Sequence, residues 1–266
     1  MIERRRLLGV LDCAAPLAGA AFMERFCAAA GRRAVGAGPA VLWSEAVPLE
    51  HDDAAQAPAP AAVLMALHAL ERLGVDAVAM PGAAGHAWYR DLCAAAHVPV
   101  MHIVECAAAD LRRARPAGSR VGVLAAAASD GAGMYRARLR QLAYDVIETP
   151  EPVAAAMAGA AGLISRGDAA GAAALVRACV RDMAGAGVSA VVLVCADVLC
   201  AARGPLAGAA GAGGGSRGGA REPLVIDPLG SLARVAASWC RGGCDAWDLV
   251  VDIPAEEPEA AAAPPA

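Results

Sequence analysis

Short runs of consecutive apolar residues recur along the chain, and most are followed by a stretch whose apolar positions have helical spacing. The clearest run lies within 187–199, opens at a glycine and is rich in valine. Unbroken apolar runs of this length are typical of strands buried on both faces of a parallel sheet. The same reasoning predicts strands at 7–11, 40–46, 77–80, 98–103, 120–124 and 224–228, and helices at 18–30, 61–73, 86–96, 105–115 and 229–239. This alternation predicts a doubly wound α/β fold with mostly parallel sheets.

The second half of the chain repeats the first at a constant offset. Gly122 follows Gly9 by 113 positions within similar apolar runs, and Gly187 follows Gly74 by the same offset. Two matches at one offset indicate a duplicated unit, so we expect two related α/β lobes, a pseudo-symmetric pair with a cleft between them. The expected boundaries are 1–115, completed by 229–250, for the first lobe and 116–228 for the second, with a flexible Gly/Ala loop at 207–220 and a disordered tail at 251–266.

Two equivalent strand ends carry different residues. Cys195 follows the run of the second lobe, and Gly82 follows the matching run of the first. Ligands of open α/β sheets bind beyond the carboxyl ends of the strands, which makes Cys195 a candidate for chemistry. A cysteine at a strand end is also a common packing residue, and from this segment alone packing is the favoured interpretation.

Composition and charge narrow the class of partner. The chain has 266 residues, is 58% hydrophobic and has a formal net charge of −4. Without a basic footprint, nucleic acid and anionic membranes are poor candidates, and a small-molecule partner fits better. The chain starts with charged residues, and the apolar stretch that follows is interrupted by glycine, Asp12 and Pro16, so we expect a strand and turn there, with no export signal or membrane span.

The arrangement of cysteines and histidines along the sequence indicates no metal centre. Nine cysteines are scattered without a disulfide framework, and Cys240 and Cys244 lack zinc-ligand spacing. The cluster of His51, Asp52 and Asp53 is expected to be a solvated turn. We therefore expect no metal, reduced thiols and a cytoplasmic location.

Several motifs in order resemble one known family. Residues 9–16, Gly-Val-Leu-Asp-Cys-Ala-Ala-Pro, stand where that family has Gly-Ile-Leu-Gly-Gly-Met-Gly-Pro, and 81–86 stand where it has Pro-Cys-Asn-Thr-Ala-His. Residues 98–105 match Ile-Pro-Val-Leu-His-Ile-Xaa-Glu, 122–135 match a block that ends in Ser-Gly-Xaa-Tyr, and 194–197 match Gly-Cys-Thr-Glu. On these motifs the chain resembles the aspartate/glutamate racemase family, within the Asp/Glu/hydantoin racemase superfamily.

The resemblance implies a mechanism and a set of site residues. It implies two Rossmann-like lobes and an isomerase without a cofactor, and a homodimer is its expected assembly. Such an enzyme holds an acidic amino acid between two cysteines, one of which removes the α-proton while the other protonates the opposite face. Here the first cysteine is Gly82, and only the second remains, as Cys195. The substrate-binding positions carried over are Gly82, Ala83, Ser129 and Ala196, most of which lack the hydroxyl or amide of the family pattern.

Three functions remain open from the sequence. The first is a racemase that uses Cys195 as its catalytic thiol, with a different residue or a water serving the other face. Cys13 and His86 are nearby candidates, although both also have structural interpretations. The second is a single-cysteine decarboxylase of a substituted malonate, in which loss of carbon dioxide generates the carbanion without a base. The third is a non-catalytic homologue that binds a small acid.

Overall fold

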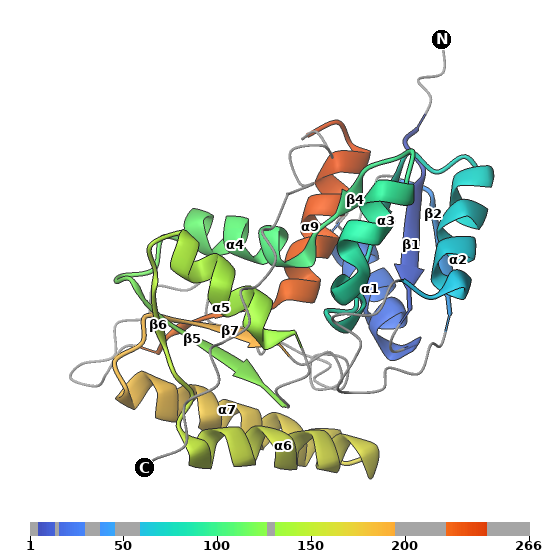
Figure 1. Ribbon diagram of the computed structural model, residues 1–266. Coiled ribbons are helices and arrows are strands. Elements are labelled where there is room, and N and C mark those ends of the chain that lie inside the picture. The colour runs from blue at the N-terminus through green and yellow to red at the C-terminus, as the bar shows by residue number, and fades with distance from the viewer. Residues whose placement is uncertain are drawn as a thin grey trace, which may run out of the picture.

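Two four-stranded parallel β-sheets form the framework of the part of the protein that the structure describes (Figure 1). The computed structural model describes residues 5–13, 16–29, 38–45, 59–126, 131–194 and 222–243. The predicted loop at 207–220 and tail at 251–266 lie outside these residues. The elements confirm the predicted α/β class, because a helix or helical turn separates most successive strands.

The first sheet has the strand order β2-β1-β3-β4, and a helix follows each of its strands. Apolar residues occupy both faces of β1 and β3, as expected for central parallel strands. The elements of this half are β1 (Leu8–Asp12), α1 (Pro16–Ala29), β2 (Ala40–Ser44), α2 (Ala61–Arg72), β3 (Ala77–Ala79), the 3₁₀ helix η1 (Ala84–Trp88), α3 (Tyr89–Ala95), β4 (Val100–Met101) and α4 (Ile103–Ala114).

The second sheet has the equivalent order β6-β5-β7-β8. Its central strand β7 is buried along its whole length, as the valine-rich run predicts. The elements of this half are β5 (Arg120–Ala125), α5 (Ala132–Gln141), β6 (Asp145–Ile147), α6 (Glu151–Ser165), α7 (Ala169–Gly185), β7 (Ala190–Val194), β8 (Leu224–Ile226) and α9 (Pro228–Cys240).

The register of the central strands repeats between the sheets. Gly9 of β1 lies opposite Val78 of β3, and Gly122 of β5 lies opposite Val191 of β7. Each residue of the second pair follows its counterpart by 113 positions. Both glycines are also places of close approach: a Cβ at Gly9 would come within 3.3 Å of Val78, and one at Gly122 would clash with Met183 of α7. The internal repeat therefore extends to hydrogen-bond register and to packing.

Helices cover both faces of each sheet and join the two sheets through a shared core. A smaller cluster of buried side chains lies under α2 and α3. A larger cluster runs from the other face of the first sheet, through α1, α4 and α9, to the strands and helices of the second. Figure 1 shows α9 between α1 and α4, and α6 beside α7 along the second sheet. α9 thus packs against α1 and α4, two helices of the first half of the chain.

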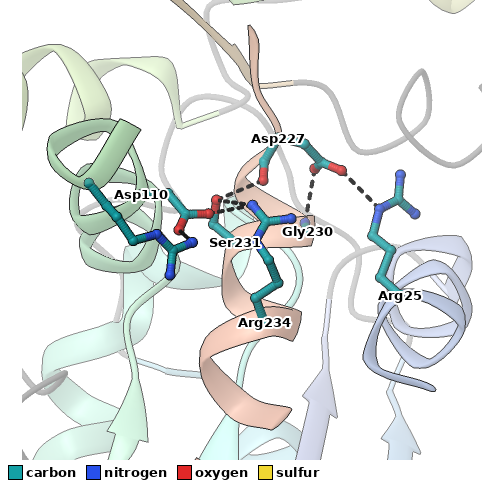
Figure 2. A network of polar contacts seen from close by, with 7 residues as sticks. Arg25, Asp110, Asp227, Gly230, Ser231 and Arg234 are labelled. Carbon is teal, nitrogen blue, oxygen red and sulfur yellow. Dashed lines mark hydrogen bonds and ion pairs between the residues drawn. The ribbon is translucent and has the colours of Figure 1, made fainter. Parts of the chain in front are cut away.

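A polar network surrounds the first turns of α9 (Figure 2). Asp227 accepts the backbone N–H of Gly230 at 3.0 Å and pairs with Arg25 of α1 at 2.9 Å. Asp110 of α4 pairs with Arg234 of α9 and, at 2.5 Å, with Arg113. These contacts link three helices whose sequence positions lie far apart.

Some predicted boundaries differ from the structure. The helix expected at 86–96 is two elements, η1 and α3, because the His86 side chain is directed back to the carbonyl of the preceding turn. The strand expected at 98–103 contains only Val100 and Met101, since α4 already begins at Ile103. None of the helices that the structure describes is long and apolar enough to span a bilayer.

Candidate active site

The carboxyl ends of the central strands define the candidate site. β1 ends at Asp12, and its neighbour β3 is followed by Pro81 and Gly82. In the second sheet β5 and β7 run in parallel, with Ala125 opposite Val194, the last residue of β7. Cys195 is therefore the next residue after a buried strand end, at the position that matches Gly82 in the repeat.

The turn that follows β3 comes close to the start of α5. Gly131 directly precedes α5 and has a positive φ of 73°, a backbone conformation that residues with a side chain rarely adopt. A Cβ at Gly131 would lie 3.4 Å from both the Cβ and the carbonyl oxygen of Ala83. The turn that carries Gly82 and Ala83 thus contacts the residues at the start of α5, across the two sheets.

His86 holds the turn after β3 in place. Its Nδ1 lies 2.9 Å from the carbonyl oxygen of Gly82, and its Nε2 accepts the backbone N–H of Ile103 at 3.2 Å. Since a carbonyl can only accept and an amide N–H can only donate, the ring is a neutral imidazole with its proton on Nδ1. Burial lowers the pKa of His86 to about 4, which agrees with this assignment. Both ring nitrogens are occupied, so the geometry supports a structural role for His86.

Cys13 lies beside the same turn. Its side chain is buried, and a Cβ at Gly85 would come within 2.5 Å of its sulfur. Burial and the neighbouring charge of Asp12 raise the pKa of the Cys13 thiol to about 12. At neutral pH the group is therefore a protonated thiol, which can donate a proton far more readily than it can accept one.

Asp12 is a buried acid that sequence reasoning did not place in the site. Its carboxylate accepts the backbone N–H of Gly19 at 2.8 Å and so caps the beginning of α1. An aspartate directly after a buried strand was the available signal. The residue is 1% exposed and adds negative charge next to Cys13.

A second imidazole, that of His102, lies at the start of α4. Its Nδ1 accepts the backbone N–H of Val104 at 3.2 Å and caps the helix. The ring packs edge-on against His86 and Tyr89, with centroid distances of 4.6 and 4.4 Å. Burial, with the nearby His86 and Arg138, lowers the pKa of His102 to about 2.

An ion pair between α4 and α5 adjoins this cluster. Arg138 donates from Nη2 to Glu105 at 2.9 Å, and its Nε lies 2.5 Å from the other carboxylate oxygen. The hydroxyl of Tyr135, one turn earlier on α5, is buried and has no hydrogen-bond partner among the described residues. Burial, then the charges of Cys106 and Asp227, raise the pKa of Tyr135 well above its usual range.

The structure describes two of the five site residues expected from the sequence. Gly82 is buried in the turn after β3, and Ala83 is half-buried beside Gly131. Ser129, Cys195 and Ala196 lie outside the described residues. Their assignment as site residues remains a prediction.

Comparisons with solved structures give the same fold at low sequence identity. The aspartate racemase homologue of Pyrococcus horikoshii OT3 matches with a TM-score of 0.67 at 14% identity, over 90% of this chain and 100% of that one. The aspartate racemase of Picrophilus torridus matches with a TM-score of 0.67 at 14% identity, over 89% and 94%. The glutamate racemase of Francisella tularensis, solved with D-glutamate, matches with a TM-score of 0.61 at 12% identity, over 92% and 83%.

The sequence itself identifies the family. A search of curated protein sequences finds no match. The family model for Asp/Glu/hydantoin racemases matches residues 13–209, which is most of the chain and includes both central strand ends. The chain belongs to the Asp/Glu/hydantoin racemase family.

Proposed function

We propose that the protein is a cofactor-independent isomerase that racemises an acidic amino acid or a related carboxylate by thiol-mediated proton transfer at the α-carbon. The observation that carries the proposal is the repeated register of β1/β3 and β5/β7, which makes positions 82 and 195 equivalent strand ends. Racemisation needs proton-transfer groups on two faces of one carbon, and facing strand ends of two lobes supply that arrangement.

In this proposal Cys195 is the base. Its thiolate removes the proton from Cα, and the electron pair of the C–H bond is delocalised into the substrate carboxylate. Backbone N–H groups near the start of α5 are suitable donors for that developing charge, because helix N-termini favour anions. In the proposal the substrate site comprises Gly82 and Ala83 in the turn after β3, together with Ser129 and Ala196, which follow β5 and β7 in the sequence.

Cys13 is the proposed donor for the second face. It is a neutral thiol next to the turn that carries Gly82, whereas both nitrogens of His86 are engaged with backbone groups. The S–H bond of Cys13 breaks as the new Cα–H bond forms, which leaves a thiolate at Cys13 and a thiol at Cys195. The following turnover runs in the opposite direction and restores the starting state.

The decisive experiment measures proton exchange and inversion together. Wild-type protein is incubated with L-aspartate, L-glutamate and related α-amino acids in D₂O, loss of the α-proton signal is followed by NMR, and the enantiomers are separated by chromatography. Cys195→Ala is expected to abolish both signals. Cys13→Ala is expected to reduce racemisation by about 100-fold or more, the usual contribution of one acid–base group.

The exposed thiol of Cys27 provides a matched control, so Cys27→Ser is expected to retain the wild-type rate. Circular dichroism checks that each variant is folded. Absence of exchange in wild-type protein across the amino acid panel, or full activity of Cys195→Ala, would overturn the proposal. A wild-type rate in Cys13→Ala would remove Cys13 from the mechanism.

A homodimer in a reducing cytoplasm also belongs to this proposal. Light scattering on the purified chain tests the dimer: the mass of a monomer at micromolar concentration contradicts it.

A further inference from the structure

Two histidines and a glutamate meet on the surface of the first lobe, away from the candidate active site. His68 and Glu71 lie one turn apart on α2, and His97 lies in the connection between α3 and β4. α2 leads into β3, and His97 shortly precedes β4, so the cluster lies at the amino ends of these strands. Gly82 follows the carboxyl end of β3. The cluster therefore lies at the end of the sheet opposite to the residues of the proposed racemase site.

The two imidazole rings converge on one oxygen of the Glu71 carboxylate. Nδ1 of His68 lies 3.0 Å from Oε2 of Glu71, and Nδ1 of His97 lies 3.2 Å from the same oxygen. The three potential ligand atoms all lie within 4.8 Å of one another. Ligand atoms about 2.0–2.1 Å from a zinc ion stand roughly 3.3 Å apart in a tetrahedron. The observed spacing therefore needs only small side-chain rotations to close around one ion.

Glu71 is held in position for such a role. Its Oε1 accepts the backbone N–H of His97 at 2.5 Å, which directs Oε2 toward both imidazoles. Its side chain is 13% exposed, whereas those of His68 and His97 are 42% and 83% exposed. A well-ordered carboxylate thus faces two rings that can rotate, with water available for a remaining coordination position.

The electrostatics of the cluster favour a cation. Glu71 supplies a carboxylate whose two oxygens face hydrogen-bond donors of His68 and His97. The carboxyl end of α2 adds partial negative charge from its helix dipole. Nδ1 of each ring donates to Oε2 of Glu71 in the metal-free protein, so metal binding requires that the ring proton moves to Nε2 and leaves Nδ1 as the ligand.

We propose that His68, Glu71 and His97 form a binding site for a divalent transition-metal ion, with zinc as the ion tested. Two imidazole nitrogens and one carboxylate oxygen are a donor set that suits zinc, copper and nickel and discriminates against calcium and magnesium. The bound ion would connect the end of α2 to the segment before β4 and so stabilise the first lobe. This site differs from the sequence-based expectation of no metal, because its ligands come from two segments that only the fold brings together.

The experiment compares zinc binding in variants of the full chain. Equilibrium dialysis measures the zinc bound by wild type and by His68→Ala, His97→Ala and Glu71→Gln. Each of these variants is expected to bind one zinc equivalent fewer than wild type does. The affinity of the altered site for zinc is expected to be at least about tenfold weaker than in wild type. Glu71→Gln retains an acceptor for the His97 N–H, so its loss of zinc cannot be assigned to that hydrogen bond.

Thiols are the competing zinc ligands in this chain. Cys27→Ser, which removes an exposed thiol, is therefore the matched control and is expected to bind as wild type does. Zinc should also raise the thermal midpoint of wild type and leave that of the double variant His68→Ala/His97→Ala unchanged, since only binding to the folded state stabilises it. Equal zinc stoichiometry in wild type and this double variant, or absence of zinc from wild type, overturns the proposal. Neither result depends on racemase activity.

Discussion

At the scale of single residues, two buried imidazoles underlie the loops of the candidate site. His86 joins the turn after β3 to the start of α4, and His102 caps that helix. Each ring nitrogen that contacts the backbone does so as part of a neutral ring, which allows full burial without a counter-ion. The geometry of the turn around Gly82 therefore depends on the protonation state of these two side chains.

Stability is expected to fall as the pH is lowered from about 6.5 toward about 4. The ordinary pKa of histidine is 6.5, whereas in the folded protein it is about 4 for His86 and about 2 for His102. As the pH falls through this window the unfolded chain takes up protons that the folded protein does not, so unfolding is favoured. Each histidine contributes about 1.4 kcal/mol per pH unit.

Urea denaturation at pH 7.5, 5.5 and 4.5 measures this dependence. His86→Gln keeps a donor and an acceptor at the position but does not titrate, so its free energy of unfolding should depend less steeply on pH than that of wild type. Identical slopes for the two proteins would show that His86 is not responsible.

At the scale of elements, side-chain caps start two helices of the second half, α7 and α9. Asp168 accepts the backbone N–H of Gly171 at 2.8 Å and caps α7. Asp227 does the same for Gly230 at the start of α9 and also pairs with Arg25 of α1. The two caps are chemically alike, but only the second also connects two helices (Figure 2).

Removing the two caps should therefore have unequal costs. Asp168→Ala is expected to destabilise the protein by about 1 kcal/mol, the usual cost of a lost cap, and Asp227→Ala by about 2 kcal/mol because a charged hydrogen bond is lost as well. Urea denaturation of both variants measures the difference. In the Arg25→Ala background the cost of Asp227→Ala should drop toward that of Asp168→Ala; an unchanged cost would exclude the Arg25 pair as the cause.

At the scale of the whole molecule, the two sheets share one large core, and an ion pair lies within their junction. α4 follows a strand of the first sheet and α5 a strand of the second, and Glu105 joins Arg138 between them. The side chain of Glu105 is 7% exposed, so its charge is largely removed from water. A buried charge is tolerated only while its partner remains.

Breaking this pair on one side should be more damaging than replacing both residues. Arg138→Met leaves the Glu105 carboxylate buried without its partner and is expected to cost about 3 kcal/mol, whereas Glu105→Leu/Arg138→Met is expected to recover most of that loss. Denaturation followed by both far-UV circular dichroism and tryptophan fluorescence gives the free energies and shows whether the lobes unfold together. A double variant less stable than Arg138→Met would contradict the assignment of the cost to an uncompensated charge.

The sequence by itself determined the fold class, the order of most strands and helices, and the family. The apolar runs identify buried strands because central parallel strands are covered on both faces. The constant offset between the two halves is visible in the sequence and is kept in the folded protein. The pairing of Gly9 with Val78 and of Gly122 with Val191 then follows the same offset.

Only the tertiary structure decided which side chains meet. His86 reads in the sequence as a residue that opens a helix, yet its ring bonds Ile103, 17 residues later, and this requires the turn and the helix to be folded against each other. Glu71 and His97 are 26 residues apart and come together because β3 and β4 are neighbours in the sheet. Local patterns report burial and periodicity, whereas contacts between distant polar groups depend on sheet order and register, which the chain encodes only through its complete packing.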